Sequence, residues 1–323
     1  MSIKDEKGVA LVLALAVIAL LVSLVVDFSY TMMVDLTLAA NLRDEQKAFY
    51  VARSGVELAR HLLEKDDSTY DALDEDWALL PEHPGFISED DEGRFKVTIE
   101  DEAAKIPINK LIQKDSTGKT IVNEQLERLF AVLELDPELI NPIIDWLDTD
   151  SDPQLSGAED AYYQSLPAPY PCKNGPLDAL EELILVKGMT KEILYGQEEK
   201  KGLIHFLTLY SDDNGKININ TATAEVIQSL SDKIGKVFAQ ALVDYLQEKP
   251  FTEKINPNVI NSLLEGGAGD NDIYNAIDDQ CNINSSYFSL RVEGKVREIK
   301  KVIYTVLKRE AGKGAKPVFW RVE

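Results

Sequence analysis

The feature that most constrains this chain is the apolar run "VALVLALAVIALLVSLVV" at residues 9–26, close to the N-terminus. Only Ser23 is polar, and neither Pro nor Gly interrupts the run. At about 1.5 Å per residue, a helix over this run would be roughly 27 Å long, close to the hydrocarbon thickness of a bilayer. A helix on the surface of a globular domain keeps a polar side for water, and this run has none. We therefore predict that residues 9–26 form a transmembrane helix.

A secretory signal peptide is the main alternative for this run. Signal peptides have a shorter apolar segment that ends at a small-residue cleavage site. No such site closes the run, and the break in the pattern falls before it, at Lys7-Gly8. After the run, apolar residues recur at helical spacing without any Pro: Leu38, Leu42, Phe49, Ala52, Val56, Ala59 and Leu63. The pattern predicts one helix over 9–65, apolar in its first half and amphipathic in its second.

The charge balance limits the classes of partner. The chain of 323 residues has 34 Lys plus Arg against 56 Asp plus Glu, a formal net charge of −22. Such a charge repels phosphate backbones, so we expect no nucleic-acid partner. An acidic surface instead favours solubility and divalent cations.

Few residues suited to catalysis are present. The two cysteines are too few for a zinc cluster, and the three histidines show no metal-ligand spacing. Paired carboxylates are the remaining catalytic material, and the sequence singles out no pair. We therefore predict that the chain is not an enzyme.

Strand patterns occur on both sides of a long helical stretch. Residues 94–100, 286–294, 296–308 and 318–322 read as strands, with a turn expected at Glu293-Gly294. About 170 residues of mostly helical pattern separate the first strand from the others. The prediction is an α+β fold: a long N-terminal helix packed on a small antiparallel sheet, with a large α-helical domain inserted in the sheet.

The helical stretch contains two similar segments, "KIPINKL" from residue 105 and "KININTAT" from residue 216. Each is followed by a pair of predicted short helices. Such pairs resemble helix-hairpin-helix modules, many of which bind DNA backbones. The Gly-x-Gly pattern of those modules is incomplete around Gly188 and Gly235, and the region is acidic, so DNA binding is not expected.

The densest group of acidic residues lies at a predicted helix end and in the loop after it. Crowded carboxylates repel one another unless a cation neutralises them. Calcium takes six to eight oxygen ligands and suits a flexible loop. Pro153 stands where an EF-hand has Gly, so the segment is not an EF-hand, and a solvated acidic loop remains the alternative. The candidate ligands are Asp148, Asp150, Asp152, Glu159 and Asp160.

The two cysteines, Cys172 and Cys281, are about 110 residues apart. Outside the cytoplasm they could form a disulfide, and closing so long a loop would stabilise the fold by about 4 kcal/mol. Two free thiols are the alternative, and we predict the bridge.

The N-terminal pattern resembles the type IV pilin and pseudopilin family: a short polar leader ending in Gly8, then an apolar helix with an amphipathic extension. The resemblance implies that a prepilin peptidase cuts between Gly8 and Val9 and methylates the new terminus. Most members have Glu at the fifth mature position, where this chain has Leu13. Minor pseudopilins of the protein K type, from type II secretion systems, are known to lack that Glu.

Further segments resemble the protein K type. They are "GRFKVTIEDEAAKIPINKL" (93–111), "IIDWLDTDSDPQLSGAEDAYYQSL" (143–166), "PLDALEELILVKGMT" (176–190), "KININTAT" (216–223) and "SSYFSLRVEGKVREIKKVIYTVLKRE" (285–310). The resemblance then implies a leader over 1–8, a pilin-like core over 66–105 and 283–323, and an inserted domain over 106–282. It also implies calcium binding in the inserted region.

The same resemblance implies a function. The chain would be a single-pass protein of the bacterial inner membrane with its bulk in the periplasm. It would join minor pseudopilins I and J in a complex at the tip of a pseudopilus built from the major pseudopilin, and start its assembly for protein export. Two alternatives stay open: a minor pilin of a type IV pilus, and a membrane-anchored periplasmic binding domain.

The missing acid gives a physical reason for a tip position. Burying an unpaired amine is costly, so each added subunit needs a carboxylate below it. With Leu13 in place of Glu, this chain offers none to a subunit above it, although its own amine can pair with a subunit below. The bulk of the inserted domain supplies a second, steric reason.

Overall fold

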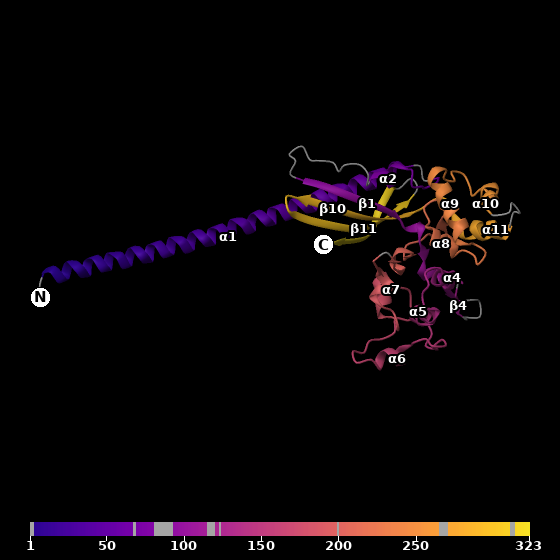
Figure 1. The fold of residues 1–323 in the computed structure, drawn as a ribbon, viewed down its shortest axis with the longest axis horizontal. Coiled ribbons are helices and arrows are strands. Elements are labelled where there is room, and N and C mark those ends of the chain that lie inside the picture. The colour runs from indigo at the N-terminus through magenta and orange to yellow at the C-terminus, as the bar shows by residue number, and fades with distance from the viewer. Residues whose placement is uncertain are drawn as a thin grey trace.

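The computed structural model describes residues 3–66, 69–80, 93–114, 120–122, 124–198, 200–264, 271–310 and 314–323. Figure 1 shows a long helix, α1 (Ile3–Lys65), that projects from a folded body and ends on it. The predicted continuous helix is confirmed, and it also runs through residues 3–8. Among the described helices, α1 alone is long and apolar enough to cross a membrane.

The second half of α1 packs on a four-stranded antiparallel sheet. The strands are β1 (Gly93–Asp101), β10 (Tyr287–Val296), β11 (Ile299–Glu310) and β12 (Gly314–Val322), in the order β1-β10-β11-β12. One stripe of α1 is buried against the sheet: Ala48, Ala52, Val56, Ala59 and Leu63. Alternate residues of β10, such as Phe288, Leu290 and Val292, are buried in the same core. The predicted α+β fold, with strands from both sides of the helical stretch, is confirmed.

The expected turn at Glu293-Gly294 is wrong. Both residues lie inside β10, and the hairpin turns at Arg297 and Glu298. Arg297 has a left-handed φ of 54°. Gly294 is needed for a different reason, because a Cβ there would lie 2.3 Å from the carbonyl oxygen of Ala48 on α1. A glycine inside a strand can mark a close backbone approach instead of a turn.

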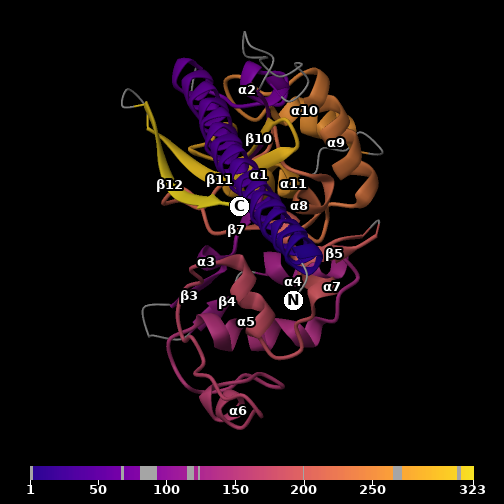
Figure 2. The ribbon, with the colours of Figure 1, turned by 90° about the vertical axis from the view of Figure 1, so that its left-hand side faces the viewer.

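The inserted residues form two lobes, which Figure 2 shows as α3–α7 on one side and α8–α11 on the other. The first lobe contains β2 (Ile106–Pro107), α3 (Ile108–Leu111), β3 (Ile112–Lys114), β4 (Thr120–Val122), α4 (Gln125–Val132), η3 (Pro137–Leu139), α5 (Ile140–Leu147), α6 (Asp160–Gln164), η4 (Leu180–Leu185), α7 (Lys191–Tyr195), β5 (Gly196–Gln197), β6 (Lys200–Lys201), η5 (Leu203–His205) and β7 (Leu207–Thr208). The second contains β8 (Ile217–Asn218), α8 (Ala224–Gln228), α9 (Lys236–Glu248), α10 (Pro257–Leu263), α11 (Asn271–Gln280) and β9 (Cys281–Asn282). Two short elements, α2 (Asp76–Leu79) and η2 (Glu102–Ala104), flank β1 in the sequence.

The two similar sequence segments take the same place in their lobes. The first contains β2, which pairs in parallel with β7 at the end of the first lobe. The second contains β8, which pairs in parallel with β9 at the end of the second lobe. In each lobe the two strands bring the entry and the exit of the chain together.

A buried polar network joins the inserted lobes to the sheet. Asn218 Nδ2 and Ser285 Oγ both donate to Asp101 Oδ2, at 3.0 and 2.6 Å. The backbone N–H of Ser285 donates to Asp71 Oδ2 at 2.7 Å, and Arg309 Nη2 pairs with the same carboxylate at 2.5 Å. The pKa of Asp101 is raised because the group is fully buried. Since these five residues come from five separate segments, the network fixes the direction in which the insertion leaves the sheet.

The predicted Cys172–Cys281 disulfide is not formed. Both cysteines are free thiols. Cys172 lies in the first lobe, where its Sγ contacts the carbonyl oxygen of Asp145 at 3.6 Å. Cys281 is buried in β9 of the second lobe, opposite Ile217. Each thiol is therefore held by the packing of its own lobe.

Candidate functional site

Two of the predicted metal ligands lie where α5 ends and α6 begins. Asp148 follows α5, and its extended backbone (φ −77°, ψ 176°) ends the helix. Glu159 precedes α6 and is also extended (φ −114°, ψ −173°). The loop between them folds back, so both carboxylates lie in one place although eleven positions separate them in the sequence.

Three acidic side chains form a compact cluster in this place. Asp148, Asp150 and Glu159 each offer a carboxylate oxygen, and these three oxygens lie within 4.8 Å of one another. Asp148 and Glu159 are only 3% and 5% exposed. Buried carboxylates at such short separations repel one another strongly.

Several buried oxygens here lack a hydrogen-bond donor. Both carboxylate oxygens of Glu159 and Oδ1 of Asn174 are buried without a well-formed hydrogen bond, although the side chains of Cys172 and Asn174 lie near enough to Glu159 to lower its pKa in part. Asn174 Nδ2 donates to the carbonyl oxygen of Asp150 at 2.7 Å, which places this side chain at the cluster. Buried acceptors are normally satisfied, and a bound cation is one way to satisfy them. Carboxylate and amide oxygens in a loop fit calcium.

The charge state of Glu159 reflects the same crowding. Its pKa is raised to about 7 by burial and by the negative charges of Asp145 and Asp148. A divalent cation would remove this penalty, because it favours the ionised form of each carboxylate.

Asp145 shapes the loop around the cluster. Its carboxylate accepts the backbone N–H groups of Gln154 and Ala158 at 3.0 and 2.6 Å. Gly157 passes so close that a Cβ there would lie 1.9 Å from Asp145 Oδ2. Lys187 Nζ donates to the carbonyl of Gly157 at 3.1 Å from the other side. Asp145 and Gly157 therefore position the loop that carries the ligands.

Aromatic rings support the helix ends beneath the loop. Trp146 packs edge-on against Tyr163, with ring centroids 5.1 Å apart, and Tyr163 lies 5.4 Å from Tyr170. The Tyr163 hydroxyl accepts the backbone N–H of Lys187 at 3.2 Å. Trp146 and Tyr163, which both belong to the segment 143–166, thus contribute to packing.

Two predicted ligands, Asp152 and Asp160, lie outside the cluster. The side chain of Asp152 is exposed, and its backbone N–H donates to Asp150 Oδ1 at 3.2 Å. Asp160 is exposed and accepts the backbone N–H of Cys172 at 2.9 Å. Asn174 could not be predicted as a ligand, because nothing near it in the sequence marks one and only the fold of the chain brings it to the loop.

A second group of acids, Asp66, Asp71 and Glu75, gathers after α1. Arg309 pairs with Asp66 at 2.7 Å and with Asp71 at 2.5 Å. The pKa of Glu75 is raised to about 7, mainly by burial. Because a guanidinium already neutralises this group, it is an ion-pair network of the fold and not a second metal candidate.

The predicted processing site lies on the exposed part of α1. Gly8 has open space around its Cα, and the side chains of Val9 and Leu13 are 63% and 61% exposed. No acidic residue occurs between Gly8 and Asp27. A peptidase or a neighbouring helix would therefore meet an unobstructed, apolar surface here.

Comparison with known proteins shows which proteins this chain is similar to. Two family models, both described as type II secretion system protein K, match residues 104–196 and 217–253. Protein K of the type II secretion system of Pseudomonas aeruginosa is 26% identical over 95% of this chain and 90% of its own length. Protein K of Aeromonas hydrophila is 25% identical over 99% of this chain and 97% of its own length.

A solved structure shows the same fold. It is the crystal structure of the GspK–GspI–GspJ complex from enterotoxigenic Escherichia coli, with a TM-score of 0.67 and 20% identity, matched over 88% of this chain and 99% of that chain. The matches to protein K of Pseudomonas aeruginosa and Aeromonas hydrophila cover nearly the whole chain, and so extend over α1, the sheet and the insertion. Both family models and the relatives thus show that the chain is similar to protein K of type II secretion systems.

Proposed function

We propose that this chain is a minor pseudopilin that joins minor pseudopilins I and J in a complex at the tip of a periplasmic pseudopilus, and that it starts the assembly of that pseudopilus for protein export. The observation that carries the proposal is the fold match over 99% of a chain solved together with GspI and GspJ. The role is one of assembly, without a catalytic step.

The exposed half of α1 has apolar side chains in two parts, one suited to a membrane and one suited to packing against other helices. Residues 9–26 suit the bacterial inner membrane, with the folded body in the periplasm. Beyond the span, Leu36, Leu38 and Leu42 are still more than half exposed. Apolar stripes that leave the membrane need partner helices, since water disfavours them. Packing of α1 among the helices of other pseudopilins would cover them.

The shape of the molecule fits the end of a filament. Figure 1 shows both inserted lobes at the end of the molecule opposite the N-terminus, the second lobe past the end of α1 and the first lobe to one side of it. Subunits of a helical filament add along the direction of this helix, so the lobes would stand where the next subunit would sit. Together with the missing carboxylate at Leu13, this placement supports a position at the tip.

We further propose that prepilin peptidase cleaves between Gly8 and Val9 and methylates Val9. The Gly-Val bond lies in an exposed part of α1, directly before the apolar run. Cleavage leaves the charged leader behind and creates the amine that a neighbouring subunit must neutralise.

We also propose that Asp148, Asp150, Glu159 and Asn174 bind calcium. Bound calcium would offset the mutual repulsion of the three carboxylates, and would tie the loop to the ends of α5 and α6. Its role would be to hold the first lobe in one shape for assembly.

The test of the function is affinity purification of the full-length chain from detergent-solubilised membranes of its own bacterium. We expect minor pseudopilins I and J to copurify. Copurification with type IV pilus proteins, or recovery of the chain alone, would contradict the proposal.

The calcium site is tested by calorimetric titration of the full chain with Ca²⁺ in detergent micelles. Asp148→Asn and Glu159→Gln should each weaken binding by about tenfold or more, since each removes a charged ligand. Asp152→Asn and Asp160→Asn are matched controls outside the cluster and should change affinity by less than about threefold. Equal effects of all four changes would indicate only a solvated acidic loop.

A further inference from the structure

The edge of the sheet formed by β12 is unpaired and exposes apolar side chains. The strand order ends on β12, and no strand of the described chain pairs with its outer side. The free N–H and C=O groups of an edge strand form a template for another strand. Proteins usually protect such edges with Pro, Lys or a bulge.

The first half of β12 has such protection, and the second half lacks it. Lys316 and Pro317 lie in the first half, opposite a shift in register at Val306 and Leu307. The second half, residues 318–322, exposes a run of apolar side chains. Their exposed fractions range from 40% to 49%: Val318, Phe319, Trp320 and Val322.

The ladder with β11 shows which backbone groups face outward. Glu323 and Val302 exchange both of their backbone hydrogen bonds, at 2.9 and 3.0 Å. Residue pairs in an antiparallel ladder alternate between bonded and non-bonded. Arg321 is therefore bonded to β11, whereas Trp320 and Val322 direct their N–H and C=O groups to the free edge.

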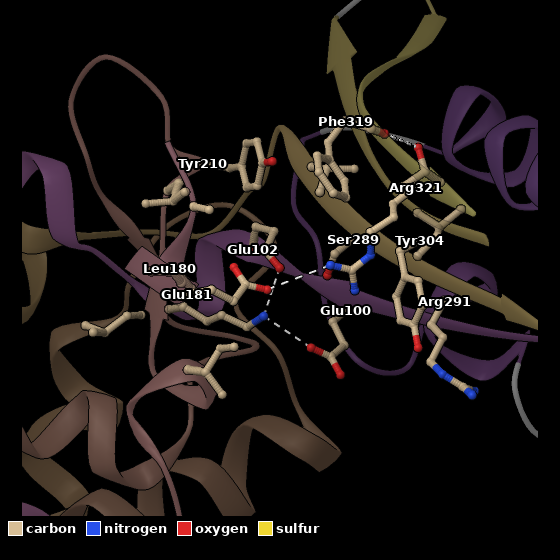
Figure 3. Close-up of a pocket in the computed structure, with 18 of the residues that line it drawn as sticks. Glu100, Glu102, Leu180, Glu181, Tyr210, Ser289, Arg291, Tyr304, Phe319 and Arg321 are labelled. Atoms are coloured by element: carbon tan, nitrogen blue, oxygen red, sulfur yellow. Dashed lines mark hydrogen bonds and ion pairs between the residues drawn. The ribbon is translucent and has the colours of Figure 1, made fainter. Parts of the chain in front are cut away.

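A cationic and aromatic patch lies beside this edge. Arg321 and Arg291 both lie over the ring of Tyr304, at 4.8 and 5.9 Å. Figure 3 shows Arg321 and Phe319 at a cavity of about 350 Å³ between the sheet and the first inserted lobe. Arg321 pairs with Glu181 across the cavity at 3.9 Å and with Glu323 at 3.2 Å, and Arg291 pairs with Glu293 at 3.5 Å. The side chains of Arg321, Glu181 and Glu323 are about half exposed, and such exposed pairs are weak enough for an acidic partner to compete for the guanidinium groups.

The sheet is basic although the chain is acidic. Against the formal charge of −22, strands β10, β11 and β12 contain only Glu293 and Glu310 as acids. Their basic residues are Arg291, Lys295, Lys300, Lys301, Lys308, Arg309, Lys316 and Arg321. Complementary charge selects partners, so a protein that docks here should present acidic residues.

We propose that residues 318–322 of β12 pair with an extended, acidic strand of another pseudopilin in the tip complex. The backbone of the free edge would supply affinity, and the Arg321–Tyr304–Arg291 patch would select an Asp or Glu side chain. The inference rests on the proposed function and adds the surface through which one partner binds.

The test uses the full-length chain in detergent micelles with purified minor pseudopilins I and J. Trp320→Pro removes the outward N–H but leaves the ladder to β11 intact. Trp320→Thr is its matched control, because it also loses the indole but keeps the N–H. We expect Trp320→Pro to weaken binding at least about tenfold more than Trp320→Thr does.

A charge reversal probes the patch in the same assay. Arg321→Glu should weaken binding, and the loss should shrink at high salt, whereas Lys254→Glu on the exposed surface of the second lobe should have no such effect. A photo-crosslinker in place of Val322, in an otherwise unchanged chain, should capture a strand of I or J. This last measurement stands even if the Pro variant fails to fold.

Different failures lead to different conclusions. If I and J bind the Pro and Thr variants equally well and residue 322 captures neither, strand pairing is wrong while the proposed function stands. If the unaltered chain binds neither I nor J, both proposals fail. Capture of a second copy of this chain by residue 322 would also overturn the inference.

Discussion

Gly294 on β10 lies against the backbone of Ala48 on α1, where a Cβ would come within 2.3 Å of the Ala48 carbonyl oxygen. The next turn of the helix is equally close, since Ala52 N would lie 2.5 Å from the same Cβ. Helix and sheet meet here backbone to backbone. Any side chain at 294 must push them apart.

We therefore expect Gly294→Ala to lower the free energy of unfolding by about 2–4 kcal/mol, because neither the strand nor the helix backbone can yield cheaply. Urea unfolding of the full chain in detergent micelles would measure it. Gly235→Ala is the control: no atom lies within 4 Å of its Cβ, and its loss should stay below about 1 kcal/mol. Equal losses would contradict the close-packing interpretation.

A second glycine, Gly157, allows a test of the proposed calcium site. Gly157→Ala would place a methyl group 1.9 Å from Asp145 Oδ2, so the loop must move away from the carboxylate that holds it. We expect calcium affinity to fall by about tenfold or more, as when residues that support ligands are changed. Calorimetric titration measures this, with Gly235→Ala as the unaffected control. Unchanged affinity would show that the loop position does not matter.

The buried network at the base of the insertion predicts a loss of stability. Asp101 Oδ2 accepts three side-chain hydrogen bonds, from Asn218, Thr221 and Ser285. Asp101→Asn must turn an NH₂ group toward these donors or toward the backbone N–H of Ala103. We expect the free energy of unfolding to fall by about 2–4 kcal/mol. The neighbouring Glu100→Gln, on an exposed side chain, should change it by less than about 0.5 kcal/mol, measured in the same urea titration.

The long elements could be predicted because their signals are local. The apolar run and the helical spacing after it lie in one continuous segment, and the period-2 pattern of residues 94–100 is visible within seven residues. The prediction of a turn at Gly294 is wrong because glycine is needed there for a different reason. The backbone of Ala48, which leaves no room for a side chain at 294, lies about 250 positions away in the sequence. Local sequence cannot distinguish these two uses of glycine.

The candidate site was predicted in part for the same reason. Asp148, Asp150 and Glu159 belong to one acidic motif, and the structure brings them together. Asp152 and Asp160 belong to the same motif, yet the fold of the loop directs them outward. Asn174 returns to the cluster from beyond Cys172, so its part depends on tertiary structure alone.

Glu75 predicts a pH dependence of stability. Burial raises its pKa to about 7 in the folded chain, above the ordinary value of 4.5, so the folded chain binds the proton more tightly than the unfolded chain. The stability that this group contributes is fully present below pH 4.5 and is lost as the pH rises through 7. Because the side chain of Glu75 is only partly buried and solvent screens its charge, we expect the unfolding free energy to fall by only about 1–2 kcal/mol over this window.

The variant Glu75→Gln isolates this effect. Its side-chain oxygen can still accept the N–H groups of Ala72 and Trp77, which bond to Glu75 at 2.8 and 3.0 Å. Urea titrations at pH 5 and pH 8 should show a smaller difference for Glu75→Gln than for the unaltered chain. A difference of the same size in both would assign the pH dependence to other groups.

The residue at position 13 predicts a change in filament assembly. Leu13→Glu would supply the carboxylate that the amine of an added subunit requires, so the chain would no longer be restricted to the tip. We expect longer or mis-started pseudopili and reduced export, measured by pseudopilus length and by secretion of a substrate of the system. Leu15→Glu is the matched control, because it brings the same cost of membrane insertion but lies about 200° further around the helix. If Leu13→Glu leaves both pseudopilus length and secretion unchanged, or if Leu15→Glu has the same effect, the missing carboxylate does not determine the tip position.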